Sequence, residues 1–157
     1  MNRFYLDTCI LVALATKEAT YEDIKAALKI VLNIDNSELV TSDFAFVEMA
    51  KVLVNQKEFK PKKASKVIND ISKNTMVDEF SFTVIPTENN PSYSFDKFWF
   101  DVAENMSLYN PGWGDAIHCV IMRNNDISNI ISIDTKDDFE IVRGINLLHP
   151  ESILHPT

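Results

Sequence analysis

Glycine is scarce in this chain, with only three among 157 residues: Gly112, Gly114 and Gly144. The phosphate-binding loops of dinucleotide enzymes and of P-loop nucleotidases require several glycines at fixed spacing, because the backbone must approach the phosphates closely. The chain contains neither a GxGxxG nor a GxxxxGK segment. The sequence therefore excludes nucleotide-cofactor enzymes of these two kinds.

Cysteine and histidine are also few. Cys9 and Cys119 form no CxxC motif, and His118, His149 and His155 share no spacing typical of metal ligands. This pattern argues against a zinc site and against a disulfide framework. We expect both cysteines to be small buried residues. We expect His118, which falls on an apolar helix, to be a core residue or to support other site residues rather than to bind a metal.

Long apolar segments are missing as well. No run approaches the roughly 20 residues that a membrane span requires, and the N-terminal MNRFYLDTCI lacks the apolar stretch and cleavage site of a secretory signal. The length suits one hydrophobic core and is too short for two. We therefore expect a single domain over residues 1–157, located in the cytoplasm and without a membrane partner.

Positive charge is in deficit, since the formal net charge is −8. Binding of nucleic acid through bulk electrostatics normally needs a basic face, so a nucleic-acid substrate would depend on metal ions or on a local basic patch. One lysine cluster could be such a patch or simply a solvated helix face. It consists of Lys57, Lys60, Lys62, Lys63 and Lys66.

Apolar strand segments alternate with amphipathic helical segments along the chain. The pattern predicts strands at residues 3–7, 38–42, 80–86, 129–133 and 145–148. It predicts helices at residues 9–16, 20–34, 43–56, 61–73, 94–109 and 115–125. Because the strands are buried without a period of two, we expect a mostly parallel sheet covered on both faces. The predicted fold class is an α/β, three-layer α/β/α sandwich.

Two acidic residues stand in unexpectedly apolar surroundings. Asp7 interrupts the segment FYLDTCILVAL, and Glu48 lies on a helical segment with Phe44, Val47 and Val52 as neighbours. A buried carboxylate that stays charged without a partner costs on the order of several kcal/mol. Both side chains therefore need a partner that compensates this cost.

Two further acids fall where they could join Asp7 and Glu48. Asp115 opens a helix after GWG, and Asp134 ends the strand segment NIISI. Taken alone, helix capping would explain Asp115 and a turn would explain Asp134. However, the carboxyl ends of parallel strands meet at one edge of a sheet, so the four acids can converge there. Crowded carboxylates repel one another unless a cation intervenes, and oxygen ligands suit Mg²⁺ or Mn²⁺. The chemistry that fits such a site is metal-assisted phosphodiester hydrolysis.

Four segments occur in the order and with the spacing of a PIN domain: FYLDTCIL, TSDFAFVEMAKVL, GWGDAIHCVIM and IISIDTKDDFE. No single segment is specific, but the ordered set resembles the VapC-like toxins and their relatives over almost the whole chain. The resemblance implies a Rossmann-like, PIN-like fold with Mg²⁺- or Mn²⁺-dependent ribonuclease activity on an RNA substrate. Such enzymes leave a 5′-phosphate and a 3′-hydroxyl. It also implies a homodimer and a small antitoxin protein that holds the toxin inactive.

Carried over by position, the catalytic and metal-binding residues would be Asp7, Glu48, Asp115 and Asp134, with Thr8 as an auxiliary residue that hydrogen-bonds water at the site. One departure concerns Phe139, which stands five residues after Asp134, whereas many relatives have a Phe three or four residues after this acid. It leaves open whether Asp137 or Asp138 adds a further metal ligand, with Asp138 favoured.

Two alternatives remain at this stage. The chain could be a catalytically silent PIN-like module that binds RNA or a protein, although such a module would have no need to keep intrusive carboxylates. It could also be a receiver-like or phosphatase-like α/β domain. The phosphatase reading is weaker because those enzymes need a second acid two residues after the first, and Cys9 occupies that position.

Overall fold

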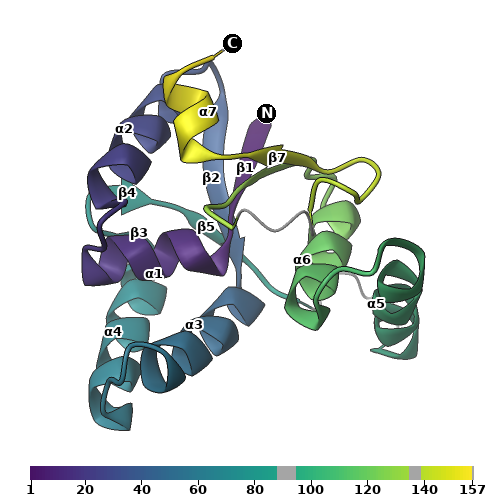
Figure 1. The fold of residues 1–157 in the computed structure, drawn as a ribbon, viewed down its shortest axis with the longest axis horizontal. Coiled ribbons are helices and arrows are strands. Elements are labelled where there is room, and N and C mark those ends of the chain that lie inside the picture. The colour runs from purple at the N-terminus through teal and green to yellow at the C-terminus, as the bar shows by residue number, and fades with distance from the viewer. Residues whose placement is uncertain (88–94, 135–138, 157) are drawn as a thin grey trace.

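A central parallel sheet organises the computed structural model, which describes residues 1–87, 95–134 and 139–156. The strand order is β5-β2-β1-β6-β7, and every neighbouring pair in this sheet is parallel. Its strands are β1 (Asn2–Leu6), β2 (Ser37–Ser42), β5 (Thr83–Ile85), β6 (Asn129–Ile131) and β7 (Asn146–Leu148). Figure 1 shows β1 and β2 running through the middle of the molecule. The C-terminal ends of β1 and β6 lie side by side, because Leu6 pairs with Ile131.

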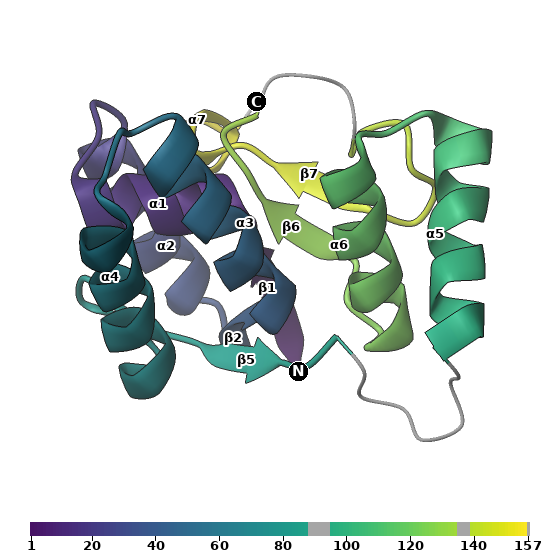
Figure 2. The same ribbon diagram turned by 90° about the horizontal axis from the view of Figure 1, so that it is seen from below.

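Helices cover both faces of this sheet. One side carries α1 (Thr8–Thr16), α2 (Tyr21–Leu32), α3 (Asp43–Asn55), α4 (Pro61–Asn74) and the short α7 (Pro150–Leu154). The other side carries α5 (Phe95–Tyr109) and α6 (Trp113–Asn124). Figure 2 shows α5 and α6 on one side of the sheet and α1, α2, α3 and α4 on the other. The predicted three-layer α/β/α sandwich is thereby confirmed.

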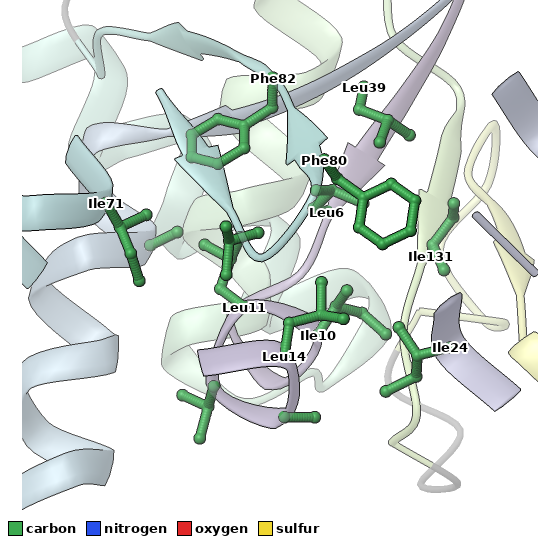
Figure 3. Close-up of a cluster of buried hydrophobic side chains, with 14 of the residues drawn as sticks. Leu6, Ile10, Leu11, Leu14, Ile24, Leu39, Ile71, Phe80, Phe82 and Ile131 are labelled. Atoms are coloured by element: carbon green, nitrogen blue, oxygen red, sulfur yellow. The ribbon is translucent and has the colours of Figure 1, made fainter. Parts of the chain in front are cut away.

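Alternate residues of the strands point into two separate hydrophobic cores, one on each face of the sheet. Phe4 and Leu6 point to the side of α1, where they pack with Leu39, Ile131 and the apolar faces of α1 and α2 (Figure 3). Tyr5 points to the opposite side and packs against α5 and α6. This alternation follows from the two-residue period of a strand, and burial on both faces explains why the strands read as continuous apolar runs.

Local sequence signals begin several of the helices. Asp7 caps α1 by accepting a hydrogen bond from the Thr8 amide, and Ser42 caps α3 through the Ala45 amide. Pro61 occupies the first turn of α4, where its missing N–H costs nothing. The caps of α1 and α3 both lie at strand ends, so the same residues end a strand and orient the following helix.

The structure corrects three details of the predicted elements. The segment 80–86 is two strands: β4 (Phe80–Ser81) pairs antiparallel with β3 (Met76–Val77) in a small second sheet, and β5 alone joins the main sheet. Helix α6 begins at Trp113, two residues before Asp115, and α7 was not expected. Within the described residues, none of the helices combines the length and apolar character needed to cross a membrane.

Candidate active site

Asp7 sits at the junction of β1 and α1, where it is only 6% exposed. Its amide donates to the carbonyl of Ile131 at 3.1 Å, which ties it to the end of β6. The Thr8 amide donates to one carboxylate oxygen at 2.6 Å, and Ser132 Oγ donates to the other at 2.7 Å. The Cys9 thiol also donates to this second oxygen at 3.0 Å. One hydrogen bond from the Asp7 amide and three to its carboxylate oxygens therefore fix the orientation of this buried side chain.

Cys9 acts here as a hydrogen-bond donor. Burial, followed by the charge of Asp7, raises the pKa of the Cys9 thiol well above its usual value. The thiol therefore stays protonated at neutral pH and supports Asp7 rather than serving as a nucleophile.

Glu48 reaches the same edge from the first half of α3. One of its oxygens accepts hydrogen bonds from Thr8 Oγ1 at 3.0 Å and from His118 Nε2 at 2.7 Å. Thr8 therefore binds Asp7 through its amide and Glu48 through its hydroxyl. It joins the first acid to the second across the start of α1.

His118 lies on α6 beneath these acids and is completely buried. Its Nδ1 lies 2.7 Å from the hydroxyl of Tyr5, which in turn lies 2.6 Å from Ser42 Oγ. Both ring nitrogens are thus engaged, one with Glu48 and one with Tyr5. The ring connects the site to β1 and to the cap of α3.

Burial and nearby charge shift the pKa values of His118 and Glu48 in opposite directions. Burial by itself lowers the pKa of His118, but the hydrogen bond to Glu48 and the nearby carboxylates of Asp7 and Asp115 raise it above its ordinary value. For Glu48, burial alone raises the pKa, but the His118 hydrogen bond and charge lower it overall. Both directions mean that the ionised form of Glu48 and the protonated form of His118 stabilise each other.

An open cleft of about 330 Å³ lies over these residues. All four predicted acids line it: Asp7, Glu48, Asp115 and Asp134. Asp115 is half-buried in the first turn of α6, whereas Asp134 is exposed beyond β6. Asp137 and Asp138 lie outside the described residues. The structure therefore brings together the whole predicted set of four from separate segments.

Positive side chains also border the cleft. Lys51 of α3 and Lys57 line it, and Lys57 pairs with Glu18 at 2.9 Å. Of the predicted lysine cluster, Lys57 is the member that reaches the cleft, whereas Lys60, Lys62 and Lys66 are exposed and outside its lining. The local basic residues at this site are thus Lys51 and Lys57.

Gly114 provides the space that the Glu48 carboxylate occupies. A Cβ built on Gly114 would lie 2.0 Å from Glu48 Oε1, far inside van der Waals contact. A similar Cβ on Gly112 would lie 2.7 Å from Asp115 Oδ2. The absence of a side chain at Gly114 therefore lets the Glu48 carboxylate lie in this position beside the first turn of α6.

The donor set of the cleft suits a hard divalent cation. Carboxylate oxygens from four segments face one solvent-accessible space, and hard cations keep several waters beside such ligands. Donor atoms of Asp7, Glu48 and His118 also lie within 4.8 Å of one another. Because both nitrogens of His118 are already hydrogen-bonded, the ring fits the role of orienting Glu48 better than that of a ligand.

Four contributions to this site were absent from the sequence predictions: the hydrogen bond from Cys9 to Asp7, and the roles of Ser132, Gly114 and Lys51. The position of Ser132 at the end of a strand was the available signal, but its contact with Asp7 depends on β6 lying next to β1. Gly114 carried no signal beyond its rarity. Lys51 stands one turn after Glu48 on the same helix, and this spacing could have indicated it.

Comparison with known proteins identifies relatives of this architecture. The family model of the PIN domain matches residues 4–144. Among curated protein sequences, none matches significantly. Three solved structures are similar in fold, and their identities of 14–16% support a likeness of fold alone.

The first is the structure of VapBC2 from Rickettsia felis bound to a DNA fragment from their promoter, with 14% identity, a TM-score of 0.61 and coverage of 94% of this chain and 98% of that chain. The second is VapC20 from Mycobacterium tuberculosis, described as a sarcin-ricin loop cleaving toxin, with 16% identity, a TM-score of 0.59 and coverage of 85% and 91%. The third is DNA-bound VapBC from Salmonella typhimurium, with 16% identity, a TM-score of 0.60 and coverage of 96% and 99%.

Proposed function

Because this chain belongs to the PIN domain family, we propose that it is a metal-dependent endoribonuclease and the toxin of a toxin–antitoxin pair. The observation that carries the proposal is the convergence of Asp7, Glu48, Asp115 and Asp134 on one cleft. The reaction would be hydrolysis of RNA phosphodiester bonds with Mg²⁺ or Mn²⁺, and we assign it to a single domain over residues 1–157 in the cytoplasm.

In this proposal the four acids would hold the cation. When bound, the cation supplies positive charge for the phosphodiester and lowers the pKa of water. Ser132 and the Thr8 amide orient Asp7, and His118 and Thr8 orient Glu48. These contacts fix the carboxylates of buried Asp7 and half-buried Glu48 before the substrate arrives, so little reorganisation is needed during the reaction.

The positive charge at the rim gives the substrate its orientation. The chain is acidic overall and Lys57 is paired with Glu18, so phosphate groups are attracted locally by Lys51 rather than by a basic face. The hydroxyl of Thr8, which donates to Glu48, also borders the cleft and can hydrogen-bond water there. RNA as the substrate is supported by the similarity of fold to VapC20, a sarcin-ricin loop cleaving toxin.

A small antitoxin protein is the proposed partner, together with a second copy of the chain in a homodimer. The antitoxin is supported by the similar structures, several of which are complexes of the VapBC type or a toxin–antitoxin complex from Klebsiella pneumoniae.

Cleavage of a structured RNA tests the proposed reaction. We expect fragments with Mg²⁺ or Mn²⁺, no fragments with EDTA, and at least about 100-fold slower cleavage by Asp7→Asn, because loss of a direct ligand exceeds the loss of a supporting contact. Exposed Asp78 lies outside the cleft lining, so Asp78→Asn is the matched control and should cleave like the wild type. Cleavage that survives EDTA, or that Asp7→Asn retains, would contradict the proposal. RNA binding without cleavage would favour the silent module.

A further inference from the structure

A second hollow adjoins the acidic cleft. It has a volume of about 520 Å³ and is lined by Phe44, Val47, Glu48, Lys51, Trp113 and Gly114. Glu48 and Lys51 line both spaces, so the two adjoin at these side chains. One space is lined mainly by polar groups, and the other places two aromatic rings beside the same glutamate.

The aromatic rings are held in a defined arrangement. Phe44 packs edge-on against the His118 ring, with centroids 5.2 Å apart and an interplanar angle of 66°. Trp113 in turn lies against Phe44, with centroids 5.5 Å apart and an angle of 38°. A chain of rings therefore leads from the buried imidazole outward to Trp113.

Trp113 is 53% exposed and stands on the first turn of α6, two residues before Asp115. Val47 beside it is 64% exposed. A large exposed indole leaves apolar surface in water, which is unfavourable unless a ligand covers it. Trp113 is therefore close to Asp115 in the sequence, and it lines the same hollow as Glu48.

We propose that Trp113 and Phe44 form a base-binding subsite for one unpaired nucleobase of the RNA substrate. This inference rests on the proposed ribonuclease function. The base stacks on the exposed indole of Trp113, and Lys51 at the boundary of the two spaces attracts the phosphate that enters the acidic cleft. Stacking on aromatic side chains is the usual way in which proteins hold single-stranded bases, and it tolerates any base.

RNA fits this hollow better than a peptide for two reasons. The hollow shares Glu48 with the acidic cleft, where the proposed phosphodiester would lie, so a neighbouring nucleotide can occupy this adjoining space. The boundary between the spaces carries a lysine, whose charge suits a phosphate. A protein segment seated on Trp113 is the competing outcome of the test.

Tryptophan fluorescence gives a direct readout, because the chain has only two tryptophans, Trp99 and Trp113. Trp99 lies on α5 with its ring edge-on to Phe98 and serves as the matched control. In an Asp7→Asn background, which keeps the RNA intact, a short single-stranded RNA is titrated against Trp99→Phe and against Trp113→Phe. We expect quenching of the emission of Trp113 in the first protein and unchanged emission of Trp99 in the second.

Kinetics on the otherwise unchanged enzyme supply the second measurement. We expect Trp113→Ala to raise the KM for RNA about 10-fold, Trp113→Phe to stay close to the wild type, and Trp99→Ala to have no effect. Because Trp113 is exposed, its replacement should leave the melting temperature nearly unchanged, and this is measured alongside.

The outcomes separate the subsite from the proposed function. Metal-dependent cleavage with an unquenched Trp113 and an unchanged KM for Trp113→Ala would overturn the subsite and leave the ribonuclease intact. Quenching of Trp113 by a copurified protein but not by RNA would also overturn it and would mark a protein-docking surface. If the wild type neither binds nor cleaves any RNA tested, the function fails and the subsite fails with it.

Discussion

Two groups of carboxylates in the described part of the chain differ in their partners. At the surface, Asp78 accepts a hydrogen bond from the Tyr21 hydroxyl at 2.9 Å, and Glu79 pairs with Lys25 at 2.9 Å and Lys29 at 3.1 Å. In the cleft, hydroxyls, a thiol, an amide and the imidazole of His118 contact buried Asp7 and half-buried Glu48.

The different partners of the surface acids and the cleft acids indicate different roles. Lysines from α2 neutralise the surface acids within the chain, so those acids tie α2 to the segment between β3 and β4. Neutral donors fix the position of the cleft acids without removing their negative charge, apart from the contribution of His118. A set of acids oriented in this way retains affinity for an external cation.

The largest expected effect is stabilisation by metal. We expect Mg²⁺ at 100 times its dissociation constant to stabilise the wild type by about 2.7 kcal/mol, because the cation binds the folded chain only. Asp7→Asn should lose this gain, whereas Asp78→Asn should keep it. Thermal unfolding with and without Mg²⁺ measures both. An equal shift in the two variants would mean that the cleft does not hold the cation.

We expect His118→Asn to lower both the rate of cleavage and the free energy of unfolding. Loss of the bond to Glu48 should slow cleavage about 10- to 100-fold, and the loss of the buried hydrogen bonds that His118 makes with Tyr5 and Glu48 should lower the free energy of unfolding by about 1–3 kcal/mol. Exposed His155 provides the control, since His155→Asn should change neither. Rates are measured well below the melting temperature. A loss of stability with full activity would assign His118 to the core alone.

Gly114→Ala should separate activity from stability. The new methyl group would displace the end of the Glu48 side chain, which moves easily, so we expect a change of less than about 1 kcal/mol in unfolding free energy, within the helix preference for Ala over Gly. Cleavage should fall about 10-fold because the carboxylate leaves its position. Gly112→Ala, with its less severe contact to Asp115, should have the smaller effect on cleavage.

The smallest expected effect comes from the surface cluster and depends on pH. Hydrogen bonds from Tyr21 lower the pKa of Asp78, and those from Lys25 lower the pKa of Glu79. A lowered folded pKa contributes stability above the unfolded value, about 3.9 for Asp and 4.3 for Glu, and this is lost as the pH falls further.

The hydrogen bond that Lys25 donates to Glu79 raises the pKa of Lys25, so the stability that Lys25 contributes is lost only in strong base. We expect the small difference in melting temperature between wild type and Asp78→Asn/Glu79→Gln to be constant from about pH 5 to 9 and to shrink below about pH 4. Salt should also reduce it. A difference that grows in acid would contradict this account.

Much of the fold could be predicted because its signals are local. The apolar runs of β1, β2 and β6 and the periodicity of α2 specify elements by themselves, and Ser42 and Pro61 mark where helices begin. The segment 80–86 was predicted wrongly as one strand. Its first part pairs with β3 and its second part with β2, and no local pattern distinguishes these partners.

The candidate site divides in the same way. The sequence by itself determined which acids were costly to bury, because Asp7 and Glu48 stand among apolar neighbours, and which acids fall at strand and helix ends. Only the tertiary structure decided that Ser132 supports Asp7, that His118 orients Glu48 and that Gly114 makes room for it. Ser132 stands 125 positions from Asp7 in the sequence, and His118 stands 70 positions from Glu48. They depend on strand order and helix packing, which arise from burial of the whole core and not from the preferences of any one segment.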